Sequence, residues 1–336
     1  MKNNKTIIVA EAGVNHNGKI NLAKKLIKEA ALSGANYVKF QTYITKYLVT
    51  EYAKKTNYQK KNTKNNQTQF NMLKKYQLSY SDHISLINCC EKNKIKFLSS
   101  PFDKESIDLL IDLKLDTLKI PSGEITNLPY LKHIGKFSKS LILSTGMSTL
   151  DEVKNAVKIL NKAGTPLNKI TVLHCTTSYP TNMEDVNLNA MLTLKKKTGL
   201  KVGYSDHTLG AEVSIAAVTL GAKIIEKHLT VSRKMKGPDH KASLEPKDFK
   251  FMVDKIRNIE KALGSGKKIP KKNELKNMPF VRKSIVAAQK INKGDKFTNH
   301  NLAIKRPGTG ISPMYIEKLI GKVSKRNFTK DELISN

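Results

Sequence analysis

The first 264 residues alternate between runs that favour a β-strand and stretches that favour an amphipathic helix. Each β-branched run is followed by a segment whose apolar residues recur at helical spacing. The predicted strands cover residues 6–10, 37–41, 95–99, 117–120, 141–144, 170–175, 201–204 and 223–227. Eight strand–helix units in about 260 residues predict an α/β fold of the (β/α)8 TIM-barrel class. An open doubly wound sheet has the same alternation, but eight units favour closure, and no Gly-x-Gly-x-x-Gly follows the first strand.

Two segments interrupt or follow this pattern. Residues 42–69 form a polar stretch far longer than an ordinary connection, which predicts a lid or binding loop. The pattern ends at Gly264, and the lysine-rich residues 265–279 are typical of a linker. Residues 280–336 hold short β-like pieces and turns, too few for a large core of their own. We therefore expect a barrel domain (1–264), a linker (265–279) and a small domain (280–336) that leans on the barrel or on a second subunit.

The charge of the chain is strongly positive, with 60 Lys and Arg against 28 Asp and Glu and a net charge of +32. This balance invites a nucleic-acid hypothesis. However, the lysines are spread along the whole chain, and there is no zinc-finger spacing, RNP-like motif or basic heptad. We therefore expect an anionic small substrate and no nucleic acid. The three cysteines form no disulfide framework, and no apolar run suits a signal peptide or a membrane span. A cytoplasmic protein without a membrane partner is expected.

Two histidines each follow a predicted strand of one βαβ unit. His207 comes after residues 201–204, and His228 after residues 223–227. The carboxyl ends of parallel strands meet at one edge of a sheet, so the two imidazoles can converge on one divalent cation. Each histidine alone could instead cap a strand, but the pair, with Asp206, Asp239 and His240 close in sequence, favours a metal site.

Two lysines lie inside otherwise apolar predicted strands. Lys39 and Lys119 would each be costly to bury without an anionic partner. Hydroxyl groups follow the other strands, although a serine there is often only a helix cap. Two ammonium groups among hydroxyls suit a phosphate and a carboxylate, which indicates a phosphorylated keto-acid or enol substrate.

Short motifs occur in a fixed order along nearly the whole chain. They are EAGVNHNG (11–18), KFQ (39–41), SSPFD (99–103), KIPSGE (119–124), STGM (144–147), LHC (173–175), GYSDHT (203–208), EKH (226–228), GPDH (237–240) and KRPG (305–308). Together they resemble the sialic acid synthase family, which includes N-acetylneuraminate and N,N'-diacetyllegionaminate synthases. The last motif resembles that family's C-terminal antifreeze-like (SAF, β-clip) domain.

The resemblance implies an enzyme, a transferase that joins phosphoenolpyruvate to the open-chain aldehyde of an N-acyl amino sugar and releases phosphate. It implies a divalent metal on His207 and His228, typically Mn²⁺, with Mg²⁺ or Co²⁺ as alternatives, and a catalytic role for these histidines and Glu11. The implied phosphoenolpyruvate ligands are Lys39, Ser100, Lys119, Ser122, Ser144 and Ser205. The implied sugar contacts are Gln41, Tyr179, Asp239, Arg306 and Phe280. Arg306 would come from the partner subunit, which implies a domain-swapped homodimer.

The acceptor sugar is the open question at this point. The segments at residues 10–18, 119–131 and 237–246 look closest to the legionaminate branch, which takes 2,4-diacetamido-2,4,6-trideoxymannose. The alternative is N-acetylmannosamine, which gives N-acetylneuraminate. A heptulosonate-type synthase would need an extra phosphate site, and no spare arginine cluster follows the strands. A non-catalytic carbohydrate or nucleic-acid binder is the third hypothesis.

Overall fold

A computed structural model gives the structure of residues 5–63 and 67–335. The chain divides into two compact units, Met1–Gly264 and Ser265–Asn336. Each unit is described by itself. Within the described ranges, none of the helices combines the length and the apolar character that a membrane span requires.

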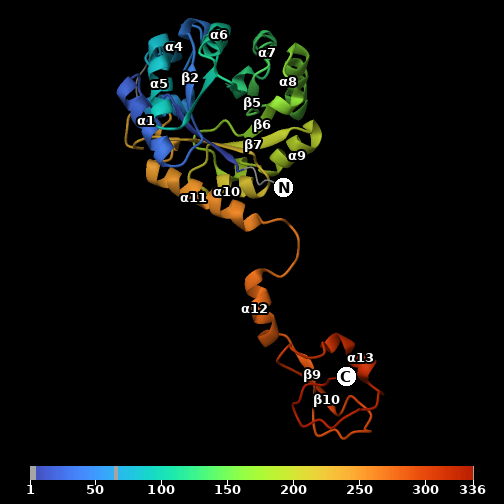
Figure 1. Ribbon diagram of the computed structural model, residues 1–336. Helices are drawn as coiled ribbons and strands as arrows, with labels where there is room; N and C mark the ends of the chain where they lie inside the picture. The colour runs from blue at the N-terminus through green and yellow to red at the C-terminus, as the bar shows by residue number, and fades with distance from the viewer. Residues whose placement is uncertain (1–4, 64–66, 336) are drawn as a thin grey trace. The chain divides into compact units, whose positions relative to one another are not determined.

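The first unit is a barrel of parallel strands (Figure 1). The strands are β1 (Ile7–Gly13), β2 (Tyr37–Thr42), β3 (Lys96–Pro101), β4 (Thr117–Ile120), β5 (Ser140–Ser144), β6 (Ile170–Cys175), β7 (Lys201–Asp206) and β8 (Ile224–His228). Their order in the described sheet is β3-β2-β1-β8-β7-β6-β5-β4, so the first strand pairs with the last. Strands β3 and β4 approach within 8 Å between Cα atoms, and no described ladder joins them. The predicted barrel fold is confirmed, with this one seam left open.

Helices surround the strands in Figure 1. They are α1 (Ile20–Leu32), α5 (Tyr80–Lys92), α6 (Lys104–Asp112), α7 (Leu128–Gly135), α8 (Leu150–Ala163), α9 (Asn189–Thr198), α10 (Glu212–Thr219) and α11 (Pro246–Leu263). Short 3₁₀ turns are η1 (Ser122–Glu124), η2 (Leu167–Lys169), η3 (Met183–Asp185), η4 (His240–Ala242) and η5 (Pro313–Tyr315). Polar caps fix where these helices begin: Asp103 accepts from the backbone N–H of Ser106, and Thr149 forms a capping box with Glu152.

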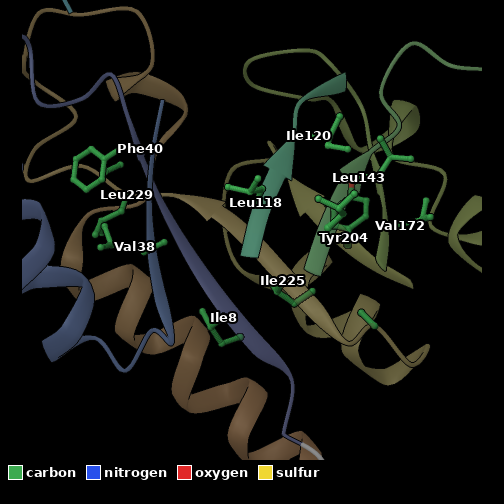
Figure 2. Close-up of a cluster of buried hydrophobic side chains, with 14 of the residues drawn as sticks. Ile8, Val38, Phe40, Leu118, Ile120, Leu143, Val172, Tyr204, Ile225 and Leu229 are labelled. Carbon is green, nitrogen blue, oxygen red and sulfur yellow. The ribbon is translucent and has the colours of Figure 1, made fainter. Parts of the chain in front are cut away.

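Alternate residues of each strand face opposite sides of the barrel wall. One set, including Ile8, Val38, Leu118, Tyr204 and Ile225, packs in the buried hydrophobic cluster shown in Figure 2. The other set forms a small apolar layer of its own, made of Val9, Leu98, Ile142, Leu173 and Ile224. Side chains on one face of a strand recur every second residue. Further along each strand, the face that carries this second set therefore presents the polar residues near the strand end. This alternation is what delivers charged side chains to the barrel mouth.

The polar stretch after β2 is not a plain loop. It contains α2 (Thr45–Leu48), α3 (Asn57–Thr63) and α4 (Gln69–Lys74), and residues 64–66 of the predicted lid lie outside the described residues. We call residues 43–63 and 67–78 the cap segment. Long-range bonds hold it: the Thr45 hydroxyl donates to Gln77 Oε1 (2.8 Å), and the Ile44 N–H donates to Asp103 Oδ2 (2.8 Å).

The second unit has its own small core. Strands β9 (Ser284–Ala287) and β10 (Leu302–Lys305) pair in antiparallel fashion, and α13 (Ile316–Leu319) follows. The core contains Ile285, Ile291, Phe297 and Phe328. Helix α12 (Lys272–Val281) crosses the expected boundary between linker and small domain, so that division at residue 280 stays a prediction.

Candidate active site

A cavity of about 290 Å³ lies at the carboxyl ends of the barrel strands. The residues that the sequence predicted for the barrel site all line it: Glu11, Lys39, Gln41, Ser100, Lys119, Ser122, Ser144, Tyr179, Ser205, His207, His228 and Asp239. The structure thus brings them together, while their individual roles stay predictions. Phe280 and Arg306 belong to the second unit, where Phe280 is exposed and Arg306 Nε donates to the Val281 carbonyl (3.1 Å). Their predicted sugar contacts also stay predictions.

Buried charges meet on the floor of this cavity. Lys39 Nζ lies 3.3 Å from Glu11 Oε2 and 3.1 Å from Glu226 Oε1. Lys119 Nζ lies 3.9 Å from the same Glu226 oxygen and donates to Ser144 Oγ (2.6 Å). The anionic partner expected for each buried lysine is therefore present within the protein itself.

Hydroxyl groups complete this floor. Lys39 Nζ donates to Ser100 Oγ (3.2 Å), and Ser205 Oγ donates to Glu226 Oε1 (2.9 Å). Ser122 Oγ accepts from the Gly146 N–H (2.9 Å), which holds it at the cavity edge. These side chains form a ring of donors and acceptors around two ammonium groups, an arrangement that suits a small oxyanion.

Glu226 is the main cavity residue that no strand-end pattern of the sequence had indicated. It stands two positions before His228 on β8, so the period of two places both on the inner face of the strand. That spacing was a usable signal. The sequence gives no such signal for the pairing of Glu226 with Lys39. This pairing depends on the strand order, in which β8 lies next to β1 and β1 lies next to β2.

The two carboxyl groups have opposite protonation behaviour. Burial raises the pKa of Glu11, and the Lys39 ammonium only partly offsets it. Burial would also raise the pKa of Glu226, but Lys119 and Lys39 outweigh burial and lower it. The pKa of Lys119 falls to about 8, because burial outweighs its attraction to Glu226. Neighbouring acids whose pKa values move apart can supply a proton donor and a fixed charge in one site.

The two histidines face each other with ring centroids 5.5 Å apart. Burial lowers the pKa of His207 and, together with His207, lowers that of His228 far more, so both rings are neutral. His207 Nδ1 donates to the Thr176 carbonyl (2.7 Å), which leaves Nε2 with a free lone pair, and His228 Nδ1 is buried with no partner among the described residues.

This geometry fits one divalent cation. Two imidazoles that share a metal at about 2.0–2.1 Å per nitrogen have centroids roughly 5 Å apart. Across residues 5–63 and 67–335, no group of three or more His, Cys, Asp and Glu side chains is gathered as a ligand set. A cation here would keep open positions for substrate, as catalytic metal sites do.

Asp206 and His240 do not join the histidine pair. Asp206 is fully buried outside the cavity lining, where Lys227 Nζ lies 2.9 Å from its Oδ2 and Ser214 Oγ donates to it (2.6 Å). His240 bonds Thr230 Oγ1 (2.7 Å) instead. Both residues are close to the histidines in sequence but lie outside the cavity lining, because neighbouring residues of a strand face opposite sides and Asp206 therefore points away from His207. Asp239 does line the cavity, and burial raises its pKa to about 7.

The cap segment covers part of the cavity. Tyr179 lies 4.2 Å from His207 between ring centroids, and Tyr58 of the cap segment lies 5.1 Å from Tyr179. Asn62 Nδ2 donates to the Pro238 carbonyl (2.6 Å) beside Asp239. The further cavity-lining residues of the cap segment are Leu48, Val49, Gln59, Gln69 and Leu73. The cavity-lining residues of the cap segment could not be singled out from the sequence, since apolar residues in this segment do not recur at a regular spacing.

Fold and cavity together define a (β/α)8-barrel protein whose charged cavity at the strand ends suits an anionic small molecule. The sequence model of the NeuB family matches residues 26–268, and that of the SAF domain matches residues 282–336. The chain belongs to the NeuB family and carries a C-terminal SAF domain, so the resemblance to sialic acid synthases is confirmed.

Named relatives extend over nearly the whole chain. It is 53% identical to the N,N'-diacetyllegionaminic acid synthase of Campylobacter jejuni, over 98% of this chain and 99% of the relative. It is 47% identical to the protein of the same name from Legionella pneumophila, over 94% of this chain and 89% of the relative. The crystal structure of the N-acetylneuraminic acid synthetase of Leptospira borgpetersenii, in complex with citrate, matches with a TM-score of 0.72. That match has 36% identity and covers 82% of this chain and 90% of the other.

Proposed function

We propose that this protein is an N,N'-diacetyllegionaminic acid synthase. It condenses phosphoenolpyruvate with 2,4-diacetamido-2,4,6-trideoxymannose and releases phosphate. The observation that carries this proposal is the 53% and 47% identity to two synthases of that name along nearly their full lengths. The alternative, synthesis of N-acetylneuraminate, has the weaker support of a 36% identical neighbour.

The buried cluster suits the binding of phosphoenolpyruvate. Lys39 and Lys119 supply two positive charges, and Ser100, Ser122, Ser144 and Ser205 supply hydroxyl groups around them. Because the low-dielectric cavity strengthens charge interactions, these groups fix the phosphate and carboxylate of the substrate. Glu226 keeps both lysines charged before the substrate arrives.

The reaction forms one carbon–carbon bond. Carbon 3 of phosphoenolpyruvate attacks the aldehyde carbon, whose oxygen takes up a proton. Water adds at carbon 2 and loses a proton, and phosphate leaves as its carbon–oxygen bond breaks. Glu11, whose raised pKa keeps it protonated near neutral pH, is placed to assist the proton transfers. Gln41, Tyr179 and Asp239 contact the acceptor and orient it.

His207 and His228 would hold the divalent cation, with Mn²⁺ as the first choice and Mg²⁺ or Co²⁺ as alternatives. When bound, such a cation polarises the aldehyde as a Lewis acid. The neutral rings and the unpartnered Nδ1 of His228 support this assignment.

A domain-swapped homodimer would complete the site with Arg306 and Phe280 from the partner. The second unit exposes large apolar side chains, among them Phe280 (74%) and Met314 (87%), as expected of a surface that is covered in an assembly. The free cysteines Cys89, Cys90 and Cys175 suit the reducing cytoplasm that we propose as its location.

Phosphate release tests the function most simply. Purified protein is incubated with phosphoenolpyruvate, Mn²⁺ and each acceptor, and the product is identified by mass spectrometry. We expect kcat/KM to be at least tenfold higher for the trideoxy sugar than for N-acetylmannosamine, and activity to vanish with chelator. A preference for N-acetylmannosamine would support the alternative instead.

A further inference from the structure

The cap segment lines the cavity with polar side chains, such as Gln59 and Gln69, and with three aliphatic ones. Leu48 at the end of α2, Val49 after it and Leu73 in α4 are half-buried and line the cavity that also holds the charged barrel residues. We call these three residues the aliphatic wall. The wall is anchored: the Tyr43 hydroxyl donates to the Leu73 carbonyl (3.0 Å), and Ile44 N donates to the cap residue of α6.

The wall and the reacting centre come from different parts of the unit: the wall belongs to the cap segment, and the reacting groups belong to the barrel strands. His207 and His228 stand at the ends of β7 and β8, and the lysines stand on β2 and β4. A line of aromatic rings leads from His207 through Tyr179 to Tyr58, which belongs to the cap segment. An acceptor whose aldehyde lies at the histidines therefore directs its other end towards the cap segment.

The two ends of the acceptor sugar differ in the same way as the two parts of the cavity. In the open-chain sugar, carbon 6 is the carbon farthest from the aldehyde, and in the trideoxy sugar it is a methyl group. A hydroxyl at this carbon would lose its water shell against aliphatic side chains that offer no hydrogen bond. We propose that Leu48, Val49 and Leu73 receive the carbon-6 methyl group and select 6-deoxy acceptors over 6-hydroxyl acceptors. This inference rests on the proposed function and identifies residues that set its specificity.

The test uses two acceptors that differ only at carbon 6. They are 2,4-diacetamido-2,4,6-trideoxymannose and 2,4-diacetamido-2,4-dideoxymannose, assayed with the full-length, Mn²⁺-loaded protein. A wall of this kind favours the methyl compound by roughly 10- to 100-fold in kcat/KM. Leu73→Asn and the isosteric Val49→Thr should each lower that ratio by roughly tenfold, because each gives the hydroxyl a partner. Leu73→Met, which keeps the surface apolar, is the matched control and should preserve the ratio.

The outcomes separate the two levels of the proposal. The KM for phosphoenolpyruvate should stay within about twofold in all variants, since the substitutions leave the lysines and hydroxyl groups that would bind its anionic groups unchanged. If Leu73→Asn and Val49→Thr slow both acceptors by the same factor, the wall does not face carbon 6 and the inference is overturned. If Leu73→Asn does not fold, Val49→Thr decides the question alone, because it changes no volume. A wild-type protein that uses neither diacetamido sugar would overturn the proposed function itself.

Discussion

At the scale of single residues, position decides the chemistry of otherwise identical groups. Glu11 and Glu226 are both buried carboxylic acids that contact Lys39. Glu226 has a second ammonium group, Lys119, nearby and a hydroxyl donor in Ser205, so its pKa falls although burial opposes this. Glu11 lacks that surplus of positive charge, and burial raises its pKa. Two neighbouring strands thus carry one neutral acid, Glu11 on β1, and one fixed anion, Glu226 on β8.

Asp239 gives a prediction about stability. Its folded-state pKa is raised to about 7 by burial, so ionisation disfavours the folded protein. The cost is absent below the unfolded pKa near 4, grows as pH rises, and is complete above the folded pKa. Asp239→Asn should therefore raise the free energy of unfolding over wild type by on the order of 4 kcal/mol at pH 8, and by almost nothing at pH 4.

Urea unfolding across this pH range checks the prediction. Asp112→Asn, at the exposed end of α6, serves as the control and should show no such trend. A stability difference for Asp239→Asn that stays constant from pH 4 to pH 8 would contradict the pKa shift that burial gives this carboxyl.

Much of the site could be predicted at this scale. Lys39 and Lys119 stand out because an ammonium group in an apolar strand needs a partner, and His207 and His228 because each follows a strand of one βαβ unit. The partner Glu226 could not be assigned, because its contacts cross three strands that are distant in sequence. Asp206 is next to His207 in sequence but does not line the cavity, because neighbouring residues of a strand point to opposite faces.

At the scale of elements, a buried ion pair outside the cavity lining links the strands that carry the two histidines. Asp206 on β7 and Lys227 on β8 form an ion pair whose side chains are 0% exposed. Asp206 also accepts from the backbone N–H (2.9 Å) and hydroxyl (2.7 Å) of Thr208, and Lys227 donates to the Thr208 carbonyl (2.6 Å). Each partner directly precedes a histidine in sequence, so this network fixes both strand ends.

Breaking one side of this pair should be costly. Lys227→Met leaves the Asp206 carboxylate buried without its counter-ion, which should destabilise the fold by about 3–5 kcal/mol. The double variant Asp206→Asn with Lys227→Met removes both charges and should recover a large part of that loss. Lys154→Met, which breaks an exposed pair with Asp151, is the control and should change stability by less than about 1 kcal/mol. Additive losses in the double variant would show that the two charges do not depend on each other.

The cap segment shows why some elements could not be predicted. Helix α2 is only four residues long, and isolated helices of that length are not stable in water. It persists because Gln77 and Asp103, both distant in sequence, accept from its first residues. The barrel helices, in contrast, carry their own period and caps, so their positions followed from the sequence within a few residues.

At the scale of the whole molecule, the alternation of strands and helices predicted the barrel, because eight parallel strands can pair with one another only around a ring or across a wide sheet. The ladder between β1 and β8, together with the approach of β3 to β4 within 8 Å, decides in favour of the ring. What the second unit does for the site is a question of assembly, and the proposed domain swap makes a distinct prediction.

Hybrid dimers test that swap. Arg306→Ala and His228→Ala should each be nearly inactive alone. If Arg306 acts on the partner's barrel, a mixed dimer contains one intact site, and an equal mixture after subunit exchange should reach about a quarter of wild-type activity. Exchange is verified with differently tagged chains. Complete inactivity of verified mixed dimers would mean that Arg306 does not act across subunits.

The most direct measurement is a crystal structure of the protein with Mn²⁺ and phosphoenolpyruvate, with the metal located by anomalous scattering. We expect one metal peak within about 2.3 Å of a nitrogen of both His207 and His228. We also expect phosphate or carboxylate oxygens within hydrogen-bond distance of Lys39 and Lys119. A metal bound elsewhere, or a substrate anion that does not reach either lysine, would contradict the account.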